Sequence, residues 1–126
     1  MLRSAAMVLT LSLSLTPPAT AMAADSAAGQ AVFNRCKICH TVEAGGRNTV
    51  GPNLHGVFGR KAGSVDNFAT YSDAMKKSGI VWDDETLTKY LRSPKEVIPA
   101  GKMAFPGIKD DGQLANLLAY LHQAAQ

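Results

Sequence analysis

Aromatic side chains are scarce in this sequence. Only 6% of its 126 residues are Phe, Trp or Tyr, which is few for the interior of a small domain. Charge is also low, because charged residues make up 18% and the formal net charge is +3, too weakly basic for a nucleic-acid binder. Hydrophobic residues nevertheless reach 46%, so the chain is too apolar to be disordered and fits one domain. Something besides aromatic side chains must fill the core.

The sequence also lacks an uninterrupted run of the roughly 20 apolar residues that a membrane-spanning helix needs. Its N-terminus has one early arginine, an apolar stretch broken by serines and prolines, and small residues around positions 21–23. This pattern predicts a cleaved secretory signal peptide over residues 1–23 and a mature domain over residues 24–126. The interruptions disfavour the alternative, an N-terminal membrane anchor.

Export predicts a periplasmic protein of 103 residues. Loss of Arg3 with the signal leaves 12 Lys and Arg against 10 Asp and Glu. Any partner that binds this nearly neutral domain through charge must therefore recognise a local charged patch on its surface. The mature chain has only two cysteines, and they lie three residues apart at Cys36 and Cys39. Such neighbours cannot cross-link distant parts of a fold, so in a disulfide-permissive compartment they indicate a local disulfide or an attached group.

Helical patterns dominate the mature chain, and no segment convincingly predicts a strand. The final helix is clearest, because Asp110 and Gln113 resemble a capping box and a leucine stripe follows at helical spacing. Irregular, glycine-rich segments cover 41–70 and 95–109, which is much loop for a small domain. We therefore predict an all-α fold with three main helices, shorter ones and long loops. The predicted helices are Ala27–Ile38 with Ser26 as N-cap, Ser72–Ser78 before Gly79, a helix capped by Asp83 through Leu91 and ended by Pro94, and the helix after Asp110.

The segment Cys36-x-x-Cys39-His40 matches the c-type haem attachment pattern. Two thiols three residues apart on a helical turn lie close enough to reach the vinyl groups of adjacent pyrroles, and the next residue brings an imidazole to the iron. A haem would also explain the shortage of aromatic side chains, since it is a large apolar disc around which long loops can close.

Two other uses of these cysteines compete with haem attachment. A thioredoxin-type redox pair follows a strand in an alternating βα pattern, which this chain lacks. A zinc site needs a second pair of ligands, whereas His55 and His122 are isolated. We favour haem over a disulfide, and a disulfide over zinc.

A second iron ligand must come from elsewhere, and the mature candidates are Met75 and Met103. A lone methionine is more often core filler than a ligand. Met103 is preferred because it lies in a Pro- and Gly-punctuated segment that can cross a ring face, whereas Met75 falls in a short predicted helix.

Longer motifs extend the match over nearly the whole mature chain. The chain resembles class I cytochrome c, of the mitochondrial and bacterial cytochrome c2 type, and these motifs are specific to it. They are CKICHTVE at 36–43, GPNLHGVFGRK at 51–61, YSDA at 71–74, GIVW at 79–82, ETL at 85–87, YL at 90–91, PK at 94–95, IP at 98–99, KM at 102–103 and the final leucines with Tyr120.

The resemblance implies a role for each site residue. It implies one haem c held by thioethers at Cys36 and Cys39, with His40 as proximal and Met103 as distal ligand. Pro52 would place its carbonyl against the other imidazole nitrogen and orient the ring.

The same resemblance implies contacts to the rest of the haem. Arg60, Tyr71 and Trp82 would contact the propionates, whose burial requires such donors. Tyr90 would approach the distal sulfur, and Phe105 would cover the haem edge.

Two departures from the family pattern concern the propionates. Met75 replaces a usual Asn and Gly101 replaces a usual Thr, so the polar network there should be reduced. Packing between the ends of the chain should be kept, with Gly29 and Phe33 against Leu117 and Tyr120.

The resemblance implies a mono-haem electron carrier and no enzyme, since two chain ligands leave no open iron position. The competing functions are a haem peroxidase or gas sensor with Met103 displaced, and a haem-free thiol-disulfide protein. A monomer is expected, with no nucleic-acid partner and no stable membrane insertion. Its partners would be a cytochrome bc complex as donor and a terminal oxidase, reaction centre or nitrogen-oxide reductase as acceptor. The expected docking cations are Arg35, Lys37, Lys95, Lys102 and Lys109.

Overall fold

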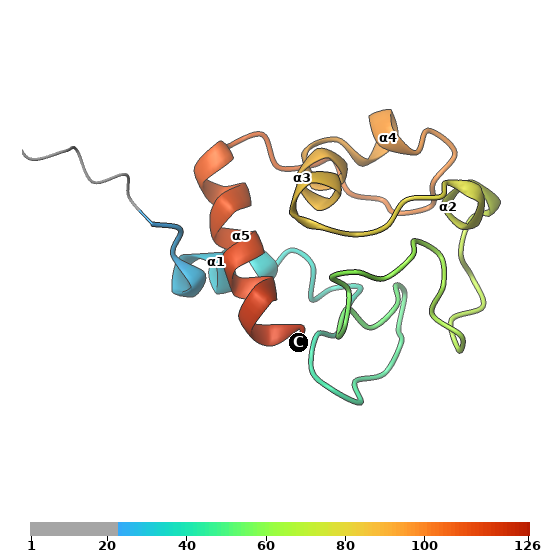
Figure 1. Ribbon diagram of the computed structural model, residues 1–126, viewed down its shortest axis with the longest axis horizontal. Helices are drawn as coiled ribbons and strands as arrows, with labels where there is room; N and C mark the ends of the chain where they lie inside the picture. Colours follow the sequence, from blue (N-terminus) through green and yellow to red (C-terminus); the bar gives the residue numbers. More distant parts are fainter. Residues whose placement is uncertain (1–22) are drawn as a thin grey trace, which may run out of the picture.

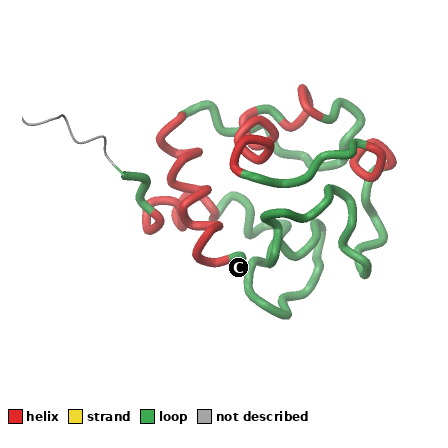
Figure 2. The backbone as a smooth tube through the Cα atoms, in the orientation of Figure 1, coloured by secondary structure: helices red, strands yellow, loops and turns green. Residues whose placement is uncertain are grey.

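The computed structural model describes residues 23–126, and the predicted signal peptide lies outside them except for its last residue. The described residues form five helices and no strand, with one isolated bridge between Lys61 and Val81. The all-α prediction is therefore confirmed, with three longer helices and two short ones separated by long loops (Figures 1 and 2). The helices are α1 (Ser26–Phe33), α2 (Asp73–Lys77), α3 (Asp84–Arg92), α4 (Pro94–Val97) and α5 (Asp111–Ala124).

Helices α1 and α5 cross in close contact and bring the two ends of the domain together (Figure 1). A Cβ on Gly29 would lie only 1.8 Å from the Asn116 carbonyl oxygen, so this crossing requires glycine. Beside it, the rings of Phe33 and Tyr120 have centroids 5.2 Å apart, and Phe33 and Leu117 are each 1% exposed. The packing expected from the resemblance is present.

Helix α1 differs from its predicted bounds at both ends. Asp25 is the N-cap, accepting from the amides of Ala27 and Ala28, so Ser26 is already helical. The α-helix ends at Phe33, because the amides of the next three residues bond to carbonyls three residues back, as in the 2.8 Å bond from Cys36 N to Phe33 O. The cysteine motif therefore lies on tight turns after the helix and not within it.

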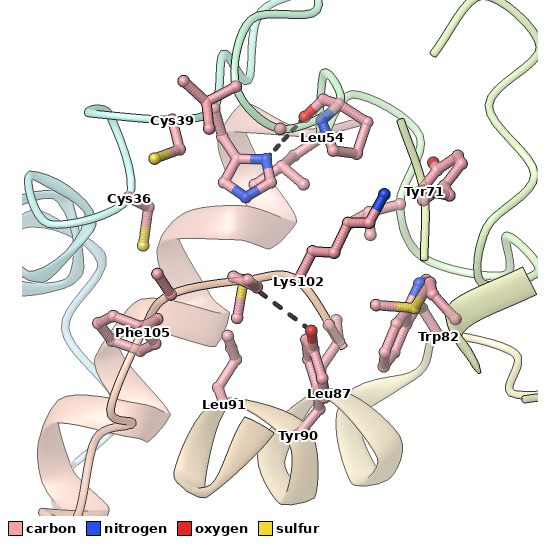
Figure 3. Close-up of a pocket in the computed structure, with 18 of the residues that line it drawn as sticks. Cys36, Cys39, Leu54, Tyr71, Trp82, Leu87, Tyr90, Leu91, Lys102 and Phe105 are labelled. Atoms are coloured by element: carbon pink, nitrogen blue, oxygen red, sulfur yellow. Dashed lines mark hydrogen bonds between the residues drawn. The ribbon is translucent and has the colours of Figure 1, made fainter. Parts of the chain in front are cut away.

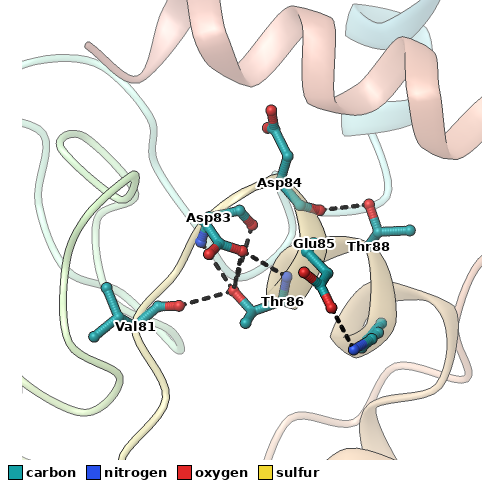
Figure 4. A network of polar contacts seen from close by, with 7 residues as sticks. Val81, Asp83, Asp84, Glu85, Thr86 and Thr88 are labelled. Atoms are coloured by element: carbon teal, nitrogen blue, oxygen red, sulfur yellow. Dashed lines mark hydrogen bonds and ion pairs between the residues drawn. The ribbon is translucent and has the colours of Figure 1, made fainter.

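Helix α3 begins with the cap that its sequence predicts. Asp83 accepts from the Thr86 amide at 2.8 Å, while the Thr86 hydroxyl accepts from the Asp83 amide at 2.9 Å (Figure 4). The same hydroxyl donates to Val81 O, which ties the preceding segment to the first turn. At its other end α3 stops at Arg92, and Pro94 starts the short helix α4 rather than only ending α3, since proline suits a first helical position.

Helices α2 and α5 also begin directly after side chains that cap them. Ser72 accepts from the amide of Met75 at the start of α2, and Gly79 follows with a φ of +71°. Asp110 accepts from the amide of Gln113 at 2.8 Å at the start of α5. The predicted leucine stripe of α5 is buried at Leu114, Leu117 and Leu121 and partly buried at Leu118.

Side-chain amides organise the long loop after α1. Asn53 donates to the Thr41 hydroxyl at 2.7 Å, and its backbone amide donates to Asn48 Oδ1 at 2.8 Å. Asn48 Nδ2 in turn donates to Asn67 Oδ1 at 2.8 Å. These bonds satisfy polar groups that regular secondary structure would otherwise pair, and they hold one wall of the cavity described next.

Candidate haem-binding site

A largely apolar cavity of about 650 Å³ lies between α3, the turns after α1 and the segment after α4. In Figure 3, Cys36 and Cys39 border one side, Tyr71 and Trp82 the other, and the side chains of α3 form a wall between them. All the site residues predicted from the sequence line this cavity. They are Cys36, Cys39, His40, Pro52, Arg60, Tyr71, Trp82, Tyr90, Met103 and Phe105.

The imidazole of His40 is oriented by the loop that follows it. Its Nδ1 lies 2.7 Å from the carbonyl oxygen of Pro52, and because a carbonyl only accepts, Nδ1 carries the proton. Burial lowers the pKa of His40, so the ring is neutral and Nε2 keeps its lone pair. A Cβ on Gly51 would lie 2.3 Å from His40 Cε1. The loop thus holds a neutral imidazole in the form that ligates a metal.

The two cysteines are free thiols that line the same cavity. Burial raises the pKa of Cys36 to about 11, whereas a reactive redox thiol has a lowered pKa. This argues against the thiol-disulfide alternative. As for zinc, residues 23–126 contain no group of three or more His, Cys, Asp or Glu side chains that could hold a metal ion.

Met103 reaches the cavity from the irregular segment after α4. Its sulfur accepts a long hydrogen bond, 4.0 Å, from the hydroxyl of Tyr90 on α3 (Figure 3). Burial raises the pKa of Tyr90 to about 12, so this hydroxyl remains a donor at neutral pH. Met75 also lines the cavity, from α2, so the structure brings both methionine candidates to one site.

Arg60, Tyr71 and Trp82 line the cavity, and Trp82 N donates to Arg60 O at 2.9 Å. The guanidinium of Arg60 donates to the carbonyl oxygens of His55 (3.0 Å) and Asn53 (3.2 Å). The hydroxyl of Tyr71 accepts from the Val65 amide at 3.4 Å, and burial raises the pKa of Tyr71. These donors border an otherwise apolar space, which places polar groups where an anionic substituent of a bound group would need them.

Several functional neighbours were not predicted. Thr49 donates through its hydroxyl to Cys39 O at 2.6 Å and helps to close the loop over His40. Leu87 and Leu91 line the cavity from α3. Leu87 lies three residues before Tyr90 and four before Leu91, and this helical spacing indicates that the three side chains share a face. No comparable signal marks Thr49, because its partner is a backbone carbonyl reached only in the folded loop.

The residues present fit a c-type haem. Close-packed interiors leave few voids larger than a water molecule, so an apolar cavity of about 650 Å³ needs an occupant. A neutral imidazole and a thioether sulfur are suitable iron ligands, and His40 and Met103 provide one of each in the same cavity. Two free thiols within the attachment spacing complete the set.

The sequence was compared with those of known proteins, and the matches cover most of the chain. Residues 26–125 match the family model of cytochrome c. The chain is 48% identical over 105 residues to cytochrome c2 of Blastochloris viridis, covering 83% of this chain and 82% of that one. It is 55% identical over 89 residues to cytochrome c2 iso-2 of Magnetospirillum fulvum, covering 71% and 91%. Identity to cytochrome c of Nigella damascena is 46% over 105 residues, covering 82% and 94%.

Proposed function

Because the chain belongs to the cytochrome c family, we propose that His40 and Met103 are the residues that would ligate its haem iron. The protein is a mono-haem electron carrier and not an enzyme, and its haem c is covalently bound through Cys36 and Cys39. When bound, the haem supplies reversible one-electron redox chemistry. The proposed ligation rests on one observation above all: a neutral imidazole and a hydrogen-bonded thioether enter one apolar cavity from separate segments.

The chain's own residues define the properties of this site. Pro52 keeps the imidazole of His40 in one orientation, and Tyr90 donates to the distal sulfur. The apolar wall from α3 excludes water and favours the less charged, reduced centre. Because the chain supplies two ligands, no iron position is left for a substrate, which disfavours the haem peroxidase or gas sensor.

The remaining predicted contacts concern the edge of the haem. Arg60, Tyr71 and Trp82 are suited to face the propionates because each brings a polar group to the cavity. Lys102 also lines the cavity, and its ammonium lies beside Tyr71 in Figure 3. Arg60 already donates to two backbone carbonyls, so its main contribution there is a half-buried positive charge. Phe105, on the side of Cys36 in Figure 3, is suited to cover the haem edge.

We propose that redox partners dock at the mouth of the cavity near Cys36 and Phe105. Ile38 and Val50 line this cavity and are 79% and 74% exposed. Their sequence neighbours are bonded to each other, because Gly51 N donates to Cys39 O at 2.8 Å. An exposed apolar pair, with Lys37 next to Ile38 in sequence, fits an acidic, partly apolar partner surface, as small transient redox interfaces use.

The expected docking cations differ in their availability. Lys95 donates to Gly101 O at 2.6 Å, Lys102 to Thr70 O at 3.5 Å and Lys109 to Arg92 O at 2.7 Å. The side chains of Arg35 and Lys37 make no hydrogen bond or ion pair within residues 23–126 and are therefore the better candidates for direct contact. All of these cations still contribute to long-range attraction.

The proposed partners are membrane redox complexes, with a cytochrome bc complex as donor and a terminal oxidase, photosynthetic reaction centre or reductase as acceptor. The proposed location is the periplasm, after removal of a signal peptide over residues 1–23 from a monomeric domain of residues 24–126. Within residues 23–126, no helix is both long and apolar enough to cross a membrane.

The ligation is tested by comparing the two methionines that line the cavity. Ferric Met103→Ala should lose the long-wavelength charge-transfer band of iron-bound sulfur, while the matched variant Met75→Ala should retain it. The haem should stay attached in both on denaturing electrophoresis with haem staining. A high-spin native spectrum, or loss of the band in Met75→Ala alone, would overturn the assignment of Met103.

The docking surface is tested by oxidation of the reduced protein on membranes of the organism that produces it. At low ionic strength, Lys37→Gln should slow oxidation by about twofold to fivefold, as expected for one charge at a contact rim. Lys89→Gln is the matched control, because Lys89 lies on α3 and pairs with Glu85. Ile38→Ser should slow oxidation at high salt as well, since apolar burial is not screened. Oxidation that is indifferent to both salt and Lys37 would contradict this surface.

A further inference from the structure

The segment that carries Met103 is fastened to the end of α3 by a reciprocal pair of side-chain contacts. The guanidinium of Arg92 donates to the Lys109 carbonyl oxygen at 3.3 Å and forms an ion pair with Asp111. In return, the Lys109 ammonium donates to the Arg92 carbonyl oxygen at 2.7 Å. Each residue therefore bonds the backbone of the other with its own side chain.

The backbones themselves meet between these contacts. Ile108 N donates to Leu91 O at 2.9 Å, and Ile108 is 1% exposed. A Cβ on Gly107 would lie 2.2 Å from Arg92 O, and the φ of Gly107 is +103°. Residues 107–111 thus lie directly against the last turn of α3, at a distance that only glycine permits at position 107.

The part of the segment that contains Met103 has only long contacts of its own, from Lys102 Nζ to Thr70 O at 3.5 Å and from the Tyr90 hydroxyl to the Met103 sulfur at 4.0 Å. No backbone N–H of residues 102–107 donates a hydrogen bond within the described chain, residues 23–126. On its N-terminal side the segment is held by Lys95, which donates to Gly101 O at 2.6 Å, and by the turn from Gly101 N to Ile98 O. The position of Met103 over the cavity therefore depends mainly on the shorter fastenings at 101 and at 107–111, to which the long Lys102 bond adds little.

We propose that Arg92, Lys109 and Asp111 form a clasp that positions Met103 by holding its segment closed over the cavity. This inference rests on the proposed ligation by Met103. The three residues are positioning residues, because none of them lines the cavity. With the clasp closed, the sulfur stays in place in both oxidation states, and external ligands reach the distal side only when the segment opens.

The arrangement differs from an ordinary surface ion pair. A single exposed pair contributes little, and the side chain of Asp111 is 85% exposed. Here the Arg92 guanidinium makes two contacts and the Lys109 ammonium makes a third. The two accepting carbonyls belong to the end of α3 and to the segment before α5, which lie against each other. Arg92 also lies in the last turn of α3 and Asp111 in the first turn of α5, where the helix dipoles favour a cation and an anion, respectively.

The clasp is tested by the rate at which imidazole displaces Met103 in the ferric holoprotein. At saturating imidazole this rate is limited by opening of the segment, and loss of the long-wavelength sulfur band reports it. Arg92→Ala should open about tenfold faster, the ratio expected for loss of one hydrogen bond to a charged group. Lys109→Ala should act in the same direction. Lys89→Ala, which removes a cation from the same helix without touching the segment, should behave like the unaltered protein.

Amide hydrogen exchange provides a second measurement that does not involve the iron. In Arg92→Ala, exchange at the Ile108 amide should accelerate, while amides of α1 and α5 should keep their protection. Rates and exchange equal to those of Lys89→Ala would overturn the clasp. If the sulfur band is absent from the unaltered protein, the ligation by Met103 fails, and the Ile108 exchange alone then decides the clasp: acceleration supports it and no change refutes it.

Discussion

The two sides of the haem cavity are built differently. On the His40 side, the loop at 49–52 forms bonds to Cys39 O from the Thr49 hydroxyl (2.6 Å) and the Gly51 amide (2.8 Å), and Pro52 O accepts from the imidazole. On the opposite side, the sulfur of Met103 has one long contact to Tyr90, at 4.0 Å. One ligand is held by its immediate surroundings, and the other by the ends of its segment.

This difference predicts which of the two ligands dissociates first. The His40 side consists of contacts between residues no more than 12 apart in sequence, adjacent to two covalent attachment points. The Met103 side depends on tertiary contacts with α3, 17 residues away. Mild stress should therefore release Met103 while His40 remains bound, because the local structure around the imidazole does not need the distal segment.

The largest expected effect comes from filling the contact between the loop and the imidazole. A Cβ on Gly51 would lie 2.3 Å from His40 Cε1 and 2.8 Å from Nε2, so Gly51→Ala must displace the ring or the loop. We expect a loss of about 3 kcal/mol in the free energy of unfolding of the holoprotein, at the upper end for overpacking. Denaturant unfolding followed by the haem absorbance would measure it.

The matched control is Gly45→Ala in the same loop. Gly45 has a φ of +72° and nothing within 4 Å of an added Cβ, so the substitution costs only backbone strain, about 1 kcal/mol. The excess loss in Gly51→Ala then measures the contact with the imidazole. Equal losses in the two variants would show that the His40 side is not closely packed and would remove the contrast between the two sides.

The features predicted well from the sequence are those determined by neighbouring residues. The attachment motif, the caps at Asp83 and Asp110 and the leucine stripe of α5 all act within a few positions, so their patterns are visible in the chain. The predicted end of the first helix, at Ile38, is wrong by five residues, because turns replace the helix after Phe33. Helical spacing continued through those turns and concealed the change.

Contacts between distant residues were not predictable in the same way. The resemblance placed all the site residues at the cavity, but sequence alone could not show that Lys95 and Lys109 bond to backbone carbonyls at 2.6 and 2.7 Å. A lysine at a docking face and a lysine holding a loop look the same in a sequence. Only the fold separates the free cations at Arg35 and Lys37 from those that support the distal segment.

The smallest expected effect concerns the single side-chain contact on the distal side. Tyr90→Phe removes the hydroxyl that donates to Met103 sulfur and keeps the ring, whose centroid lies 5.0 Å from that of Trp82. Without this donor the sulfur gives more electron density to the iron and favours the ferric state, so the reduction potential should fall. At 4.0 Å the bond is weak, and we expect a decrease of about 30 mV, roughly half of the 59 mV that a tenfold change represents for one electron.

Equilibrium redox titration would measure this shift, and the sulfur band should persist because the clasp still holds the segment. Loss of the band in Tyr90→Phe would mean that the weak hydroxyl contact, rather than the ends of the segment, retains Met103. A rise in potential would mean that the hydroxyl does not donate to the sulfur. A small fall with the band intact is the combination expected if the distal ligand is tuned by Tyr90 but positioned by Arg92, Lys109 and Asp111.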